Sequence, residues 1–281
     1  MPSFATPEPI LADLEPVVGN IRIVAGDRTE TVVEVAPLNE NNASDVDAAK
    51  RTVVEFSGGT LTVRAPKMRL LDFTNRTRSI EVTIELPAGS RIQGSTGLGD
   101  LTATGTLGAC RYKSGTGHIR LDRTGELKLR SASGNIVVEH ADGNADISTS
   151  SGRVHVGGIE GTAVVKNSNG STTIGAAGDS IRLRSANGDI TVERAESGVE
   201  AKTANGSVRV LDAARGTLTL GTSMGDIEIG IRAGSAAWLD VNTRFGRVLN
   251  DMTSATAPGD GTDKVEVHAG TAVGDIIVHR S

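Results

Sequence analysis

The chain is poor in cysteine, aromatic residues and proline, and each shortage excludes a class of protein. Its 281 residues include one Cys, one Trp, one Tyr, four Phe and eight Pro. A single thiol excludes an internal disulfide. The low proline count argues against a low-complexity linker, and 35 glycines without a Gly-X-Y period exclude collagen. With 37% hydrophobic and 22% charged residues, the chain has enough apolar material to fold around a core.

Strong charge bias and long apolar runs are also missing. The net charge is −5, with 29 basic and 34 acidic residues, so binding to nucleic acid or a membrane would have to be local. No segment approaches 18 uncharged apolar residues, which argues against a transmembrane helix. The start, MPSFATPEPI, has neither a basic n-region nor an apolar h-region of a secretory signal. We therefore expect a cytoplasmic protein.

What the chain has instead is an internal repeat of about 18 residues. A glycine marks each copy, and a Ser or Thr stands three residues before it in nearly every copy. The glycines of the regular copies are Gly99, Gly117, Gly134, Gly152, Gly170, Gly188, Gly206 and Gly225. Two looser copies follow, at Gly246 and Gly274. We interpret these glycines as structural turn residues.

Apolar residues keep a constant phase relative to these glycines. They stand two and four residues after each glycine, as Ile136 and Val138 do, and seven and five before the next, as Leu127 and Leu129 do. Each repeat thus holds two short strands with period-2 alternation. This pattern predicts an all-β, single-domain β-solenoid with about 18 residues per coil and inward aliphatic columns. Within these columns, four positions are expected to be buried: Ile136, Val154, Ile190 and Val208. The Ser and Thr row shares the inward parity and is expected to bond at a corner to backbone or to itself.

The two ends depart from the repeat. We expect regular coils over residues 96–229, flanked within one continuous solenoid by irregular coils and a cap over 1–95 and by wider coils and a cap over 230–281. The first region contains strand-like runs at 21–25, 31–35, 53–56, 60–65 and 80–86, and a polar stretch at 39–51 that suits a short helix. The last contains Trp238, Phe245 and an SATAPGDGTD loop. Large side chains near an end are typical of a cap.

Several segments carry a family resemblance. They are the opening FATPEPILADLEPVVGNIRIVAGDRTETVVEV, the ELPAGSRI segment at 85–92 and the repeated S/T-x-x-G-D/N-I-x-V units. With these segments the chain resembles the bacterial putative-adhesin family of β-strand-repeat proteins, a domain of unknown function with YvlB-like members. The resemblance covers essentially the whole chain. It implies a β-solenoid and no established activity.

Residues that would carry chemistry are few. Asp100 and His118 stand directly after the glycines of adjacent repeats, where the carboxylate could orient the imidazole as the proton-transfer pair of a glycan-active β-helix enzyme. Mixed polar turn residues produce such pairs by chance. No metal-ligand set or cofactor motif is present, and Cys110 and Tyr112 stand at inward positions. We therefore expect no enzyme activity, no cofactor and no metal site.

The outer face of the second strand of each repeat is the most informative departure from a mixed surface. Six and four residues before the six repeat glycines from Gly117 to Gly206, eight of twelve positions are basic: Arg111, Lys113, Lys128, Arg130, Lys166, Arg182, Arg184 and Lys202. These eight residues are the candidate anionic-partner face. A solubilising surface explains them as well, because outward charge discourages strand aggregation. A second basic cluster lies within 64–78, and its segment 67–78 mixes cations with apolar residues, which suits either a cap loop or contact with a membrane surface.

The sequence supports three functions in descending order. The first is a non-enzymatic scaffold or interaction protein with an unknown protein partner. The second is a binder of an anionic polymer or lipid surface through the basic face. The third is a glycan-active enzyme.

Overall fold

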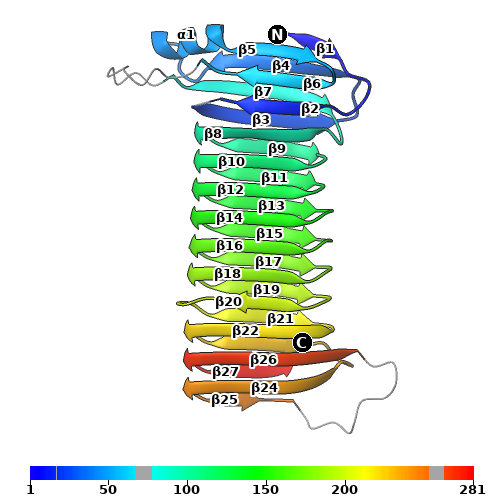
Figure 1. Ribbon diagram of the computed structural model, residues 1–281, viewed down its shortest axis with the longest axis vertical. Helices are drawn as coiled ribbons and strands as arrows, with labels where there is room; N and C mark the ends of the chain where they lie inside the picture. Colours follow the sequence, from blue (N-terminus) through cyan, green and yellow to red (C-terminus); the bar gives the residue numbers. More distant parts are fainter. Residues whose placement is uncertain (17, 67–77, 253–262) are drawn as a thin grey trace. The chain divides into compact units, whose positions relative to one another are not determined.

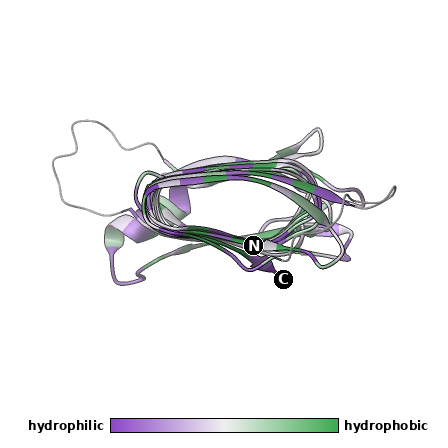
Figure 2. Cartoon of the chain, turned by 90° about the horizontal axis from the view of Figure 1, so that it is seen from below, coloured by the Kyte–Doolittle hydropathy of each residue, from purple (hydrophilic) through white to green (hydrophobic). Residues whose placement is uncertain are grey.

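The protein, seen in a computed structural model, is a β-solenoid built almost entirely of strands (Figure 1). The structure describes residues 1–16, 18–66, 78–252 and 263–281. The chain divides into two compact units, Met1–Val138 and Glu139–Ser281, called here the N-terminal and the C-terminal unit. In each unit the strands form two facing sheets (Figure 2), and from β6 (Thr60–Arg64) onward successive strands alternate between them.

The N-terminal unit holds the single helix of the described residues. Its elements are β1 Ser3–Ala5, β2 Leu11–Glu15, β3 Gly19–Gly26, β4 Glu30–Pro37, α1 Ala43–Arg51, β5 Val53–Ser57, β6 Thr60–Arg64, β7 Ile80–Pro87, β8 Arg91–Leu98, β9 Leu101–Thr106, β10 Cys110–Thr116, β11 Ile119–Thr124 and β12 Leu127–Ser133. β13, Ile136–Ala141, contains the boundary between the units. The five predicted strand runs and the helix are all confirmed, whereas β1 and β2 were not anticipated.

In the described residues of the C-terminal unit, all regular secondary structure is β-strand. They are β14 Ala145–Ser151, β15 Val154–Ile159, β16 Ala163–Asn169, β17 Thr172–Ala177, β18 Ile181–Asn187, β19 Ile190–Ala195, β20 Val199–Lys202, β21 Val208–Ala213, β22 Gly216–Met224, β23 Ile227–Ile231, β24 Ala236–Phe245, β25 Val248–Asn250, β26 Lys264–Val273 and β27 Ile276–Arg280. The predicted SATAPGDGTD loop lies almost wholly outside the described residues.

The repeat period sets the register of the stacked strands. Val154 pairs with Thr172, and Thr172 pairs with Ile190, so residues 18 apart lie side by side in parallel strands. Inward residues of one coil therefore rest on those of the next. Ile136, Val154, Ile190 and Val208 are all fully buried, which confirms the predicted phase. Cys110 and Tyr112 are buried too, as expected.

The corners of the coils are held by side chains that bond to the neighbouring coil. Hydroxyls three residues before the repeat glycines donate to glycine carbonyls one coil away, in the pairs Thr203–Gly188 (3.1 Å), Thr222–Gly206 (2.8 Å) and Thr271–Gly225 (3.0 Å). Outside the core, Asn187 donates to Asn169 and Asn205 donates to Asn187, each at 2.9 Å. These threonines thus bond to backbone, as the inward parity of the row predicts. The prediction does not hold for the serines of the row, because the buried hydroxyls of Ser114, Ser131 and Ser185 have no hydrogen-bond partner in the described part of the chain.

The order of strands at the start of the N-terminal unit differs from the order along the chain. Its two sheets read β1-β4-β7-β3-β9-β11 and β5-β6-β2-β8-β10-β12. β2 lies in parallel between β6 and β8, and β3 lies in parallel between β7 and β9. The coil of β2 and β3 is therefore inserted between two coils that are formed by residues later in the sequence.

The end of the C-terminal unit repeats this arrangement. Its sheets read β15-β17-β19-β21-β23-β27-β25 and β14-β16-β18-β20-β22-β26-β24. The last coil, β26 with β27, is paired in parallel on both sides, and β24 with β25 forms the outermost coil. Trp238 and Phe245 on β24 are 57% and 67% exposed. Both large side chains therefore point away from the core of this coil.

Candidate functional site

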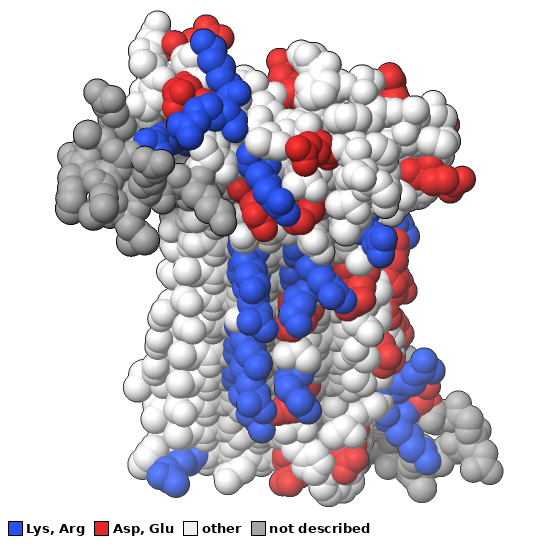
Figure 3. Space-filling view, turned by 45° about the horizontal axis from the view of Figure 1, so that its top comes forward, with Lys and Arg blue, Asp and Glu red and all other residues white. Residues whose placement is uncertain are grey.

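The basic side chains form short rows because the register aligns them on neighbouring strands. In the N-terminal unit, Arg111 on β10 pairs with Lys128 on β12, and Lys113 pairs with Arg130. All four are exposed. Lys and Arg side chains appear in Figure 3 as rows rather than as scattered points. Since neighbouring strands lie about 4.8 Å apart, like charges in a row repel one another.

The cations of the N-terminal unit are only partly neutralised. Arg111 lies 3.6 Å from Glu126. In the described part of the chain, Lys113 and Arg130 have no carboxylate oxygen within 4.0 Å, so these two neighbours carry uncompensated positive charge. A ligand with closely spaced negative groups would relieve this repulsion.

The cations of the C-terminal unit are organised differently, around one carboxylate. Glu200 on β20 accepts a hydrogen bond from Arg182 at 2.6 Å and from Arg184 at 3.3 Å, and the ammonium of Lys202 lies at 3.5 Å. The hydrogen bond from Arg182 is the main reason why the pKa of Glu200 lies below its usual value. The count of basic positions therefore overstates the free charge here, because Glu200 occupies the same row as Arg182.

The Asp100 and His118 pair has a structural role. Asp100 Oδ1 accepts a hydrogen bond from the backbone N–H of His118 at 2.7 Å, and His118 Nδ1 accepts one from the backbone N–H of Asn135 at 3.1 Å. In the C-terminal unit, Asp189 binds the N–H of Ser207 at 2.9 Å in the same way. The side chain after each of these glycines thus bonds to the coil that follows, and the carboxylate does not orient the imidazole.

Groups that could act as nucleophiles or hold a metal are not assembled. Burial raises the pKa of the Cys110 thiol to about 12, which keeps it protonated and unreactive. Within the described ranges, no three His, Cys, Asp or Glu side chains form a group suited to a metal ion. None of the helices there is long and apolar enough to cross a membrane. Most of the segment 67–78, proposed for membrane contact, lies outside the described residues.

One cluster that the sequence analysis missed is an ion-pair network in the C-terminal unit. Arg232 donates to Glu196 at 2.8 and 2.9 Å and to Asp212 at 2.6 Å. These hydrogen bonds lower the pKa of both carboxyl groups and raise that of the guanidinium. The three residues come from separate repeats, so no local sequence motif predicts the network. Ser281 also donates to Asp212, so the cluster joins Ser281 to β21.

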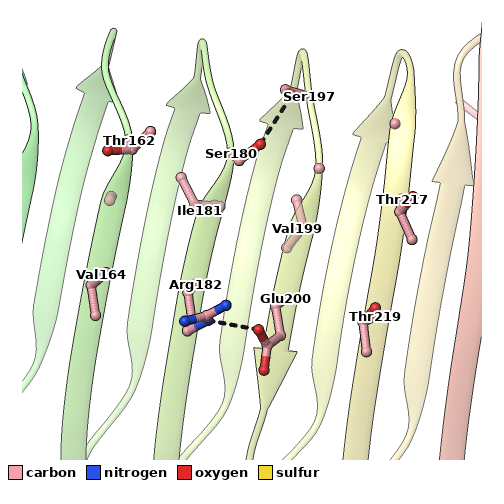
Figure 4. Close-up of a pocket in the computed structure, with 13 residues that line it drawn as sticks. Thr162, Val164, Ser180, Ile181, Arg182, Ser197, Val199, Glu200, Thr217 and Thr219 are labelled. Carbon is pink, nitrogen blue, oxygen red and sulfur yellow. Dashed lines mark hydrogen bonds and ion pairs between the residues drawn. The ribbon is translucent and has the colours of Figure 1, made fainter.

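Two adjoining hollows lie on the C-terminal unit, and the sequence analysis missed both. The first, of about 470 Å³, spans β16, β18, β20 and β22. Figure 4 shows Ser180 and Ser197 joined across it at 3.3 Å, with Arg182 and Glu200 at its side. The second, of about 520 Å³, is lined by residues of β22, β24 and β26 and includes Trp238. Gly216 and Thr217 line both, so the hollows meet there.

Comparison with known proteins identifies the fold. The family model of Toastrack DUF4097 matches residues 19–279. No curated protein matches the chain. A crystal structure of a putative adhesin from Parabacteroides merdae is similar, with 12% identity, a TM-score of 0.51, and 81% of this chain and 94% of that chain covered. A crystal structure of a putative adhesin from Parabacteroides distasonis has 13% identity and a TM-score of 0.46, with 81% of this chain and 94% of that chain covered. At 12% identity, the likeness to the first concerns the fold alone.

Proposed function

Since the chain belongs to the Toastrack DUF4097 family, a domain of unknown function, we propose that it is a non-catalytic scaffold that binds a partner through outward side chains of its sheets. One observation carries the proposal. The polar side chains best placed for chemistry, Asp100 and His118, are engaged by backbone N–H groups of the next coil. Side chains whose polar atoms already bond to the backbone of the next coil are poor candidates for general acid–base catalysis.

The scaffold proposal predicts that Asp100 matters for stability and not for turnover. Asp100→Ala removes the acceptor of the His118 N–H, so the free energy of unfolding should fall by about 1 kcal/mol in chemical denaturation. The unmodified protein should leave acidic and neutral oligosaccharides uncleaved in chromatographic assays. Cleavage that disappears in Asp100→Ala or His118→Ala would overturn the proposal in favour of a glycan-active enzyme.

A second candidate function, binding of an extended anionic polymer, is favoured by the N-terminal unit. Lys113 and Arg130 are exposed on neighbouring strands without a carboxylate partner in the described part of the chain. Their spacing of about 4.8 Å suits successive sulfate or phosphate groups. Binding of this kind releases counterions and weakens steeply as salt rises.

Heparin retention tests this candidate, and the two units provide a matched control. Lys113→Gln with Arg130→Gln should lower affinity roughly three- to tenfold at low salt, because both cations are free to contact the polymer. Arg182→Gln with Arg184→Gln removes the same charge but should have a smaller effect, since Glu200 already engages both. Glu200→Gln should strengthen retention.

The outcomes separate the alternatives for this surface. Equal losses from the two double variants would mean that net charge alone matters. Retention on anionic vesicles but not on heparin would favour a lipid surface instead. A wild-type protein that ignores heparin, nucleic acid and vesicles would leave these residues as a solubilising surface.

A further inference from the structure

Trp238 is an aromatic side chain in an unexpected place. It is the one tryptophan of the chain and lies on β24 at an outward position, beside Glu266 of β26. Its neighbours Ala237 and Leu239 point inward, and the indole is 57% exposed. A protein with so few aromatic residues gains nothing for its core from an outward tryptophan. Exposed tryptophans are characteristic of binding sites, because the ring combines a large apolar face with a polar N–H.

The indole borders a groove of ligand size. The groove, of about 520 Å³, has Gly216, Ala236 and Ala237 among its lining residues, and Lys264 and Glu266 line it beside Trp238. The small residues leave room for a ligand, and Trp238, Lys264 and Glu266 are the long side chains that line the groove. The hollow of about 470 Å³ shares Gly216 and Thr217 with this groove, so a longer ligand can continue from the groove across β20 and β18.

Polar groups surround the indole on the outer face. His268 contacts Trp238 with the ring centroids 5.3 Å apart and the planes at 64°. Its imidazole lies 3.1 Å from Glu266 and 3.5 Å from Asp240. The contact with His268 positions the indole and leaves much of its surface open. Both carboxylates are more than half exposed, so their remaining lone pairs are available to a ligand.

We propose that this groove binds a neutral, β-linked carbohydrate chain, with one sugar ring stacked on Trp238. A β-linked glucose ring carries its hydroxyls equatorially and presents a flat face of C–H groups, which suits an exposed indole. Carboxylates accept hydrogen bonds from hydroxyls, and the ammonium of Lys264 donates to ring or hydroxyl oxygens.

The charges around the groove select among ligands. Glu266 and Asp240 repel uronates and sulfated sugars, so the ligand is neutral. An apolar peptide would bury these carboxylates without partners, at a large desolvation cost. This site is distinct from the basic residues of the N-terminal unit, and its ligand differs in charge from the polymer considered above.

The single tryptophan makes the site directly observable. Cellohexaose, laminarihexaose or chitohexaose should shift and quench the indole emission in a saturable manner, whereas polygalacturonate should not. In calorimetry, Trp238→Ala should weaken binding at least tenfold, and Trp238→Phe should retain part of the affinity. Phe245→Ala is the matched control, because Phe245 is an exposed aromatic of the same strand that does not line the groove. It should bind like the wild type.

Four results would overturn the proposal. They are no saturable response to any of the three neutral oligosaccharides, equal losses from Phe245→Ala and Trp238→Ala, stronger binding of polygalacturonate than of the neutral chains, and an emission shift that depends on protein concentration alone. The last would mean that a second copy of the chain covers Trp238. Lys113→Gln with Arg130→Gln should leave sugar binding unchanged, so a failure of the polyanion proposal is distinguishable from a failure of this one.

Discussion

Replacing Gly188 by alanine should destabilise the C-terminal unit by at least about 3 kcal/mol. Gly188 has φ +136°, a conformation that L side chains rarely adopt. A Cβ at this position would collide with the carbonyl oxygen of Gly170, which is the corresponding glycine of the previous coil. Because the collision would be with backbone atoms, no side chain could move aside to relieve it. The two coils would have to separate at this corner. Chemical denaturation measures the loss.

Gly234 provides the control for the strain of a positive φ alone. It has φ +91°, and a Cβ there meets nothing within 4 Å. Gly234→Ala should therefore lower the free energy of unfolding by only about 1–2 kcal/mol. If both substitutions had the same effect, close stacking of the glycine corners would not be what holds neighbouring coils together.

A charge in an aliphatic column is expected to have a comparable effect. Val154 is fully buried and stacks against Thr172 of the next coil in the same sheet. Val154→Asp would place a carboxylate there without a cationic partner, and the free energy of unfolding should fall by about 3–5 kcal/mol. The pKa of the introduced carboxyl should rise because burial disfavours its charged form. The loss should therefore be smaller at acidic pH.

His155 is the neighbouring outward position and separates burial from strand propensity. It pairs with Thr173 and is partly exposed. His155→Asp should change stability by no more than about 1 kcal/mol. If the thermal unfolding curves of Val154→Asp and His155→Asp coincided, the assignment of inward and outward faces would be contradicted.

The regular coils were predictable because their rule is local. One glycine fixes the corner, and alternation on either side fixes which residues face the core, so Ile190 and Val208 follow from counting. The stacking order at the ends was not predictable in this way. The copies at Gly246 and Gly274 have the same phase, and either fits on the coil of Gly225. The structure places Gly274 there, which only long-range pairing decides.

The candidate binding surfaces were predictable in part for the same reason. The spacing placed Lys113 beside Arg130 correctly. It did not reveal that Glu200 engages Arg182 and Arg184, because that depends on side-chain reach between strands. The groove at Trp238 depends on three strands whose order differs from the chain order. A cytoplasmic location, the domain boundaries at residues 95 and 229 and the anionic partner stay predictions.

The coil of β26 and β27 is inserted into the stack, and this has a consequence for the order in which the C-terminal unit can assemble during synthesis. The coil of β26 and β27 occupies a slot between its neighbours. β24 and β25 are made earlier but cannot reach their final pairing until β26 and β27 have left the ribosome. β26 and β27 therefore complete this part of the stack. Once in place, they are held by ladders on both sides, so local opening of this coil would have to break two rows of hydrogen bonds at once.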